Sequence, residues 1–147
     1  MGNYMGWKYL LTDLDGRINR QRYWIGALIL IVIGLVLQMI GYMIGGEALA
    51  IIFGLTLLYP CYAINVKRAH DRGRPTWLIA VFFAVLVLVN VLQLLGLGQT
   101  AEGPTTLFLV IAIPWLIFAV YLFIELACLR GTPGANPYGP DPLAGRG

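Results

Sequence analysis

The chain has 147 residues, of which 59% are hydrophobic and only 12% are charged, and its mean hydropathy is +0.79. This composition excludes an ordinary water-soluble domain, because such a domain needs a polar surface. The net charge of +3 does not predict nucleic-acid binding, since the charges cluster at the ends of apolar segments, as in membrane proteins. We therefore expect one compact unit with several membrane-spanning helices and no nucleic-acid partner.

Residues 1–22 form an arm of mixed polarity ahead of the first apolar segment. Apolar residues recur in it at helical spacing, which predicts a short amphipathic helix lying in the membrane interface; they are Tyr4, Trp7, Leu11 and Leu14. Asp and Gly at 13–16 then favour a turn. Arg17 and Arg20 follow, three positions apart, and so share a face if that segment is helical.

Four apolar segments are each long enough to cross a bilayer core, which takes about 20 residues. We expect the spans at 23–44, 48–66, 76–97 and 105–129, so that residues 23–129 form an all-α bundle of two transmembrane hairpins. Pro60 and Pro114 predict kinks inside the second and fourth spans. Gly34, Gly41 and Gly45 place small residues on one face of the first span, where a neighbouring helix could approach closely.

The tail, residues 130–147, is rich in Gly and Pro and predicts irregular structure. Lysine and arginine fall on one side of the predicted spans. The arm, the segment between the second and third spans, and the tail hold all ten, whereas the turns near 45 and 100 hold none. The positive-inside rule then predicts that both termini are cytoplasmic.

Three amides interrupt the predicted spans: Gln38, Asn90 and Gln93. Asn90 and Gln93 are three positions apart and share a helix face. Polar amides in lipid need partners. Interhelical hydrogen bonding and a polar path through the bundle are both open interpretations.

The one dense polar segment among the apolar ones runs from Lys67 to Trp77. Guanidinium groups match phosphates bidentately, and a basic surface at the inner leaflet attracts anionic lipids. The alternative is that these residues only enforce topology. Our candidate residues for an anionic headgroup are Arg17, Arg20, Lys67, Arg68, His70, Asp71, Arg72 and Arg74.

Glu125 lies about one turn from the end of the fourth span, where burial and the helix dipole both disfavour a carboxylate. A cation at the same depth would offset both costs. The candidates for this intramembrane ion pair are Lys67, Arg68 and Arg72, with Arg20 or Arg22 also within reach. The alternative is a carboxylate that extends into the headgroup region.

Catalytic, metal and cofactor sites find little support in the residues. One histidine is too few for a His-based metal site, and the absence of serine excludes a serine nucleophile. No phosphate-binding glycine motif occurs, and Cys61 and Cys128 lie in apolar segments as packed thiols do. We predict no catalytic residues, no metal and no cofactor, and see no cleavable signal peptide.

Three motifs together resemble one family, the YhaH-like small bacterial inner-membrane proteins known as domain of unknown function 805. The motifs are Gly16-Arg17-x-x-Arg20-x-x-Tyr23-Trp24, Lys67-Arg68-x-His70-Asp71-x-Gly73-Arg74 and Gly131-Thr132-Pro133-Gly134-x-Asn136-x-Tyr138-Gly139-Pro140-Asp141-Pro142. The resemblance covers nearly the whole chain. It implies a multi-pass protein of the bacterial inner (plasma) membrane and no settled activity.

We therefore expect a non-enzymatic membrane protein whose basic cytoplasmic face recognises an anionic lipid headgroup, a small anion or a protein partner. A small transporter or channel that uses Gln38, Asn90 and Gln93 is the second hypothesis, and a homo-oligomer would suit it. A lipid-modifying enzyme with His70 and Asp71 as acid and base is a distant third.

Overall fold

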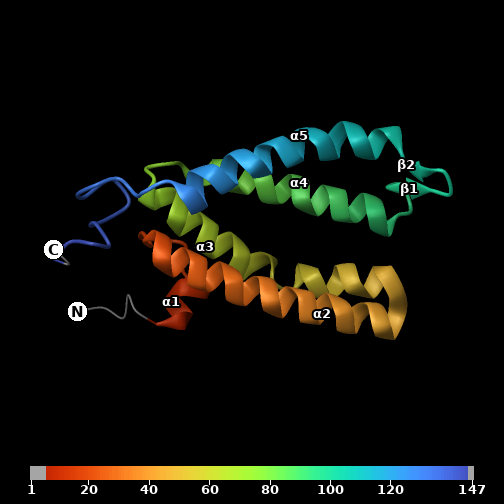
Figure 1. Ribbon diagram of the computed structural model, residues 1–147, viewed down its shortest axis with the longest axis horizontal. Helices are drawn as coiled ribbons and strands as arrows, with labels where there is room; N and C mark the ends of the chain where they lie inside the picture. The colour runs from red at the N-terminus through yellow and green to blue at the C-terminus, as the bar shows by residue number, and fades with distance from the viewer. Residues whose placement is uncertain (1–5, 146–147) are drawn as a thin grey trace.

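A computed structural model describes residues 6–145, and Figure 1 shows its helices packed side by side along one long axis. In chain order the elements are α1 (Trp7–Thr12), α2 (Arg20–Leu55), α3 (Leu58–Asp71), α4 (Thr76–Leu94), β1 (Gln99–Thr100), β2 (Gly103–Pro104), α5 (Thr106–Phe123) and the π-helical turn η1 (Ile124–Cys128). We call the end where α2 begins, α3 ends, α4 begins and η1 ends the basic end. The opposite end, with β1 and β2, is the turn end (Figure 1).

Among residues 6–145, three helical segments are long and apolar enough to cross a membrane: Arg20–Leu55, Thr76–Leu94 and Thr106–Cys128. They contain most of the predicted spans at 23–44, 76–97 and 105–129. α3 has 14 residues, which is shorter than the roughly 20 that a bilayer core requires. The described part of the chain is thus mainly helical, with three candidate membrane-spanning helices.

α2 doubles back on itself near the turn end, as Figure 1 shows. The reversal lies at Gly45 and Gly46, and the φ of Gly46 is +69°, a conformation that favours glycine. Residues 47–55, the return limb, then run back beside the residues of α2 that precede the reversal. An added Cβ at Gly41 would lie 2.6 Å from the carbonyl oxygen of Leu49. The glycine pattern of the first span therefore allows close approach of the same chain's return limb.

The predicted second span is interrupted. The return limb of α2 ends at Leu55, and α3 begins at Leu58. Pro60 lies in the first turn of α3, where a missing backbone N–H is tolerated. α3 then continues to Asp71, so the first part of the predicted basic loop is helical, and Gly73 follows with a φ of +68°. Lys67, Arg68 and His70 therefore lie on a helix rather than in a loop.

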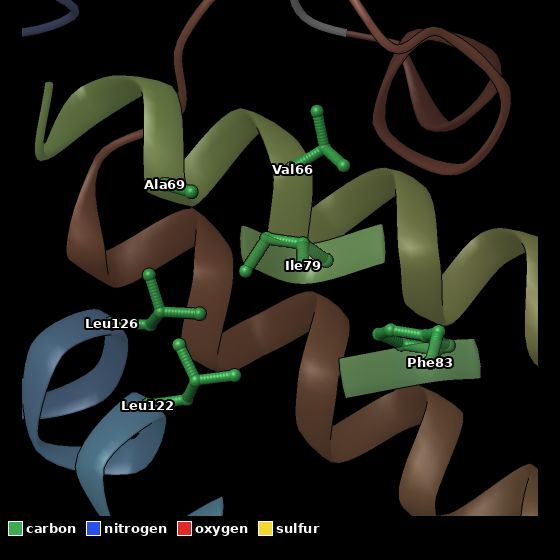
Figure 2. Packing of buried hydrophobic residues seen from close by; sticks show 6 residues of the cluster. All are labelled: Val66, Ala69, Ile79, Phe83, Leu122 and Leu126. Atoms are coloured by element: carbon green, nitrogen blue, oxygen red, sulfur yellow. The ribbon is translucent and has the colours of Figure 1, made fainter. Parts of the chain in front are cut away.

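α3 lies at the centre of the packing, between α1, α2, α4 and η1. Figure 2 shows the main apolar cluster, which joins α3, α4, α5 and η1 and consists of Val66, Ala69, Ile79, Phe83, Leu122 and Leu126. A second cluster joins α1, the following loop, α2 and α3; its residues are Leu10, Ile18, Leu30 and Ile64. Both clusters lie toward the basic end and fix the position of the polar half of α3.

Of the segment predicted to form an interfacial helix, residues 7–12 are helical and form α1, which is six residues long; its position at a membrane interface stays a prediction. Leu10 faces the second apolar cluster, whereas Trp7 is exposed. Tyr4, which belongs to the same prediction, lies outside the described residues. At the turn end, β1 and β2 pair in a small antiparallel hairpin between α4 and α5.

Candidate functional site

Charged side chains of α3 are buried at the basic end. Lys67 and Arg68 are 0% exposed, and Asp71 is 3% exposed. Because a buried charge is costly unless it is paired and hydrogen-bonded, each of them should have partners nearby. The structure supplies these partners from the arm, the end of η1 and the tail, which are far apart in the sequence. We call this assembly the hub.

Lys67 binds the end of α1. Its Nζ donates to the carbonyl oxygens of Tyr9 at 2.6 Å, Leu10 at 2.9 Å and Asp13. It also lies 4.9 Å from the centre of the Tyr9 ring. The last carbonyls of a helix have no intrahelical partner and carry partial negative charge, so an ammonium group suits them. Lys67 therefore fastens the arm to α3.

The end of η1 is held in the same way, by four side chains on five consecutive carbonyls, those of residues 126–130. Arg68 donates to the carbonyl of Leu126 at 2.7 Å and to that of Leu129 at 2.5 Å. Trp24 donates to the carbonyl of Ala127 at 3.1 Å, and Arg20 donates to that of Cys128 at 3.0 Å. Arg72 donates to the last. Arg20, Trp24 and Arg68 of the first two motifs, together with Arg72, thus cap the carbonyl end of the last helix.

Asp71 joins the arm to the tail. Its carboxylate accepts from Arg68 and from the Nη2 of Arg17 at 3.1 Å. The Arg17 guanidinium also donates to the carbonyls of Thr132 and Gly134, both at 2.7 Å. At Gly131, a Cβ would lie 2.1 Å from the Asp71 carboxylate. The third motif therefore needs glycine there so that the tail can pass the carboxylate.

His70 lies between the arm, α4 and the tail. Its Nδ1 is 3.2 Å from the Gly16 carbonyl oxygen, and its Nε2 is 2.8 Å from the Thr76 hydroxyl. A carbonyl only accepts, so Nδ1 carries the proton and Nε2 accepts in the neutral ring. The ring stacks on Tyr138 at 4.0 Å. Burial lowers the pKa of His70 below its usual value, which keeps the ring neutral.

Glu125 of η1 accepts from two arginines after α3. Its Oε1 lies 2.8 Å from the Nε of Arg74 and 3.2 Å from Arg72. Arg72 was among the candidates proposed from sequence, whereas Arg74 was not. Lys67, Arg68 and Arg20 have other partners, the carbonyls described above. The geometry thus separates the basic residues into helix caps and partners of carboxylates.

The three amides of the predicted spans lie apart from the hub. Gln38, Asn90 and Gln93 line one cleft of about 400 Å³ on the side of the turn end. The Asn90 amide donates to the carbonyl of Leu86 at 2.8 Å, within its own helix. The structure therefore brings the amides together in a cleft that Glu47 also lines, away from the charged residues of the hub.

A larger pocket, of about 730 Å³, opens at the basic end between the arm and the tail. Arg17 and Arg22 line it together with three carboxylates, those of Asp13, Asp15 and Asp141. Backbone N–H groups of the tail hold the pKa of Asp141 below its usual value. Tyr9, Tyr59 and Tyr138 add aromatic surface. These carboxylates and tyrosines were not named as site residues from sequence, although Tyr138 and Asp141 belong to the third motif and Asp15 precedes the first.

Within residues 6–145, no three His, Cys, Asp or Glu side chains gather closely enough to hold a metal ion. The arrangement is suited to binding a ligand that has both hydrogen-bond donors and acceptors, since the pocket carries side chains of both signs.

Known proteins resemble this chain over almost its whole length. Residues 11–140 match the family described as "Protein of unknown function (DUF805)". The chain is 32% identical over 146 residues to "Inner membrane protein YhaH" of Escherichia coli (strain K12), covering 95% of this chain and 89% of that protein. It is 27% identical to "Inner membrane protein YhaI", covering 97% and 91%, and 34% identical over 138 residues to "Uncharacterized protein YiiR", covering 89% and 86%, both of the same strain. No solved structure matches the chain significantly.

Proposed function

Because the chain belongs to the DUF805 family of unknown function and has relatives named as inner membrane proteins, we propose that it is a non-enzymatic binding protein of the membrane. Its ligand is the headgroup of an inner-leaflet phospholipid. The observation that carries the proposal is the pocket of about 730 Å³ at the basic end, which is lined by both arginine and carboxylate side chains.

The proposal includes four membrane crossings, with both termini in the cytoplasm. The two limbs of α2 flank Gly45–Gly46, and α3 extends the return limb to the basic end. The lysines and arginines among residues 6–145 belong to segments at that end, whereas Glu47 and Glu102 belong to the turn end. The positive-inside rule assigns such an end to the cytoplasm.

The chemistry of the pocket favours a phosphate that carries hydrogen-bond donors. Arg22 offers a guanidinium for the phosphate. Asp13 and Asp15 offer acceptors for an ammonium or hydroxyl group on the same headgroup. Tyr59, near the start of α3, also lines the pocket, and in the proposed topology this part of α3 lies within the bilayer. Phosphatidylethanolamine and phosphatidylglycerol both carry such donors, whereas phosphatidylcholine has a quaternary amine and none.

Anionic lipids gain a further attraction from basic residues whose side chains reach the surface. Arg20 is exposed, and the side chain of Arg74 is 45% exposed. Each cation near an anionic leaflet is worth about 1 kcal/mol. Lys67 and Arg68, by contrast, are fully buried and contribute by shaping the pocket.

Native mass spectrometry of the protein in detergent, with the three phospholipids added singly, tests the proposal. We expect retained phosphatidylethanolamine and phosphatidylglycerol, little phosphatidylcholine, and several-fold less retention in an Asp15→Asn, Arg22→Gln double variant. Glu102→Gln, at the turn end, is the matched control. Equal retention of all three lipids, or a double variant that behaves as the wild type, would contradict the proposal. The same spectra report whether the protein is a homo-oligomer.

The orientation has its own test. In a background without the native cysteines, a membrane-impermeant maleimide should label Glu47→Cys in intact cells. It should label Ala135→Cys, in the exposed tail, only after the inner membrane is opened. The reverse pattern would contradict the proposed topology.

A further inference from the structure

The cleft on the side of the turn end has the size and lining of a ligand site. Its volume is about 400 Å³, within the range of about 300–1,000 Å³ that is usual for small-molecule sites. A second cleft of about 380 Å³ shares four lining residues with it, Gln38, Gly54, Leu57 and Cys61. The two clefts therefore adjoin along the return limb of α2.

The first cleft has a polar part. In the part of the chain that the structure describes, the side-chain amides of Gln38 and Gln93 have no hydrogen-bond partner, although both line the cleft. The Asn90 amide uses its N–H₂ group on Leu86 and leaves its carbonyl oxygen available. Unpaired amides at the edge of a bilayer are unfavourable. A ligand with a hydroxyl or carbonyl group would pair them.

The second cleft is mainly apolar. It runs along α2 past Leu35, Gly34 and Ile31 toward Ala27. At the basic end of both clefts, the cluster in Figure 2 packs α3 against α4, and Phe83 belongs both to that cluster and to the first cleft. Ile31 and Leu35 are exposed, so the cleft is an open apolar groove that suits a hydrocarbon chain and does not favour a continuous polar path.

The charge of the residues that line the two clefts limits the charge that the head of a ligand can carry. Glu47 is the one charged side chain among the described residues that line the two clefts, so an anionic head would be repelled. The three amides offer a cationic head no countercharge, and unpaired charge within the bilayer is costly. An uncharged head satisfies the amides without this cost.

We propose that the paired clefts bind an uncharged single-chain amphiphile, with its hydroxyl or carbonyl head at Gln38, Asn90 and Gln93 and its hydrocarbon chain along α2. This site is separate from the phospholipid pocket at the basic end. It uses different residues, and each site can be tested while the other is left intact.

Photolabelling with three diazirine probes that share one alkyl chain tests the proposal in the full-length protein, reconstituted in phosphatidylethanolamine–phosphatidylglycerol vesicles. The probes are a long-chain alcohol, an alkyl sulfate and an alkyl trimethylammonium. We expect the alcohol to label residues 27–38 and the return limb several-fold more than either charged probe. A Gln38→Leu, Gln93→Leu double variant should lose most of this labelling, whereas Gln99→Leu, in β1, should keep it.

Gly54→Leu provides a second test by filling the cleft. A Cβ at Gly54 already comes within 3.3 Å of the Gln38 side chain, so a leucine would occupy the space of the ligand and abolish labelling by the alcohol. Retained phospholipid at the basic end shows that each variant is folded. The inference is overturned if a charged probe labels the clefts as strongly as the alcohol, if labelling spreads evenly over the lipid-facing helices, or if the glutamine variant labels as the wild type does.

Discussion

Replacing Arg68 with alanine removes the side chain that holds both η1 and Asp71 to α3. Arg68 is completely buried, and it donates to the carbonyls of Leu126 and Leu129 and to the Asp71 carboxylate. Removing one partner of a buried ion pair costs about 3–5 kcal/mol. The two carbonyls lose their donor in the same step, and because they belong to one network their costs do not simply add. We expect a total loss of stability of about 3–5 kcal/mol.

Thermal unfolding in detergent, followed by tryptophan fluorescence, measures this loss. At about 2–4 °C per kcal/mol for a chain of this length, the Tm of Arg68→Ala should fall by on the order of 10 °C. Arg68→Lys keeps the charge but cannot reproduce the planar fork, so it should recover only part of the loss. Arg74→Ala is the matched control, because its side chain is 45% exposed and Glu125 keeps Arg72; it should cost less than about 1 kcal/mol. If Arg68→Ala were no less stable than Arg74→Ala, the capping role would be refuted.

Three further predictions concern the tail, η1 and pH. Gly131→Ala should sharply reduce folded yield, because its Cβ would lie 2.1 Å from the Asp71 carboxylate; normal yield of monodisperse protein on size-exclusion chromatography would contradict this. Glu125→Gln should lower the folding stability by about 1 kcal/mol, since its arginine partners remain partly in water; an unchanged Tm would show that the ion pair does not contribute to stability. Burial lowers the pKa of His70 in the folded state below 6.5, so the unfolded chain binds its proton first as the pH falls. Stability should therefore be full above about pH 6.5 and decline below it; a His70→Gln variant with the same decline would exclude this origin.

The apolar segments were sufficient to predict a helical membrane protein, because hydropathy depends on composition and not on tertiary contacts. They were less informative about the second predicted span, 48–66. There Thr56 and Leu57 interrupt the helix, although neither residue is a strong breaker, and Pro60 lies within the first turn of α3 rather than at a kink. Helical structure extends through the basic residues to Asp71 because they find partners on neighbouring segments.

The basic residues at the basic end could be named from sequence, but their structural partners and the acidic and aromatic lining of the pocket could not. The cluster at 67–74 reads as a solvent-facing surface when only its charge is considered. In the structure, Lys67 and Arg68 are buried, because backbone carbonyls of α1 and η1 surround them. Every residue has a carbonyl, so sequence composition carries no signal for such partners. The close approach of Gly131 to Asp71 likewise depends on the path of the tail.

Asp71 of α3 and Arg17 of the arm act as one unit that holds the tail in place. A double-mutant cycle with Arg17→Met and Asp71→Asn, measured by denaturant unfolding in mixed micelles, tests it most directly. Pairs in one buried network couple by about 0.5–3 kcal/mol, and the 3.1 Å contact between two buried side chains predicts a coupling above about 1 kcal/mol. Single substitutions whose effects simply add would contradict the claim.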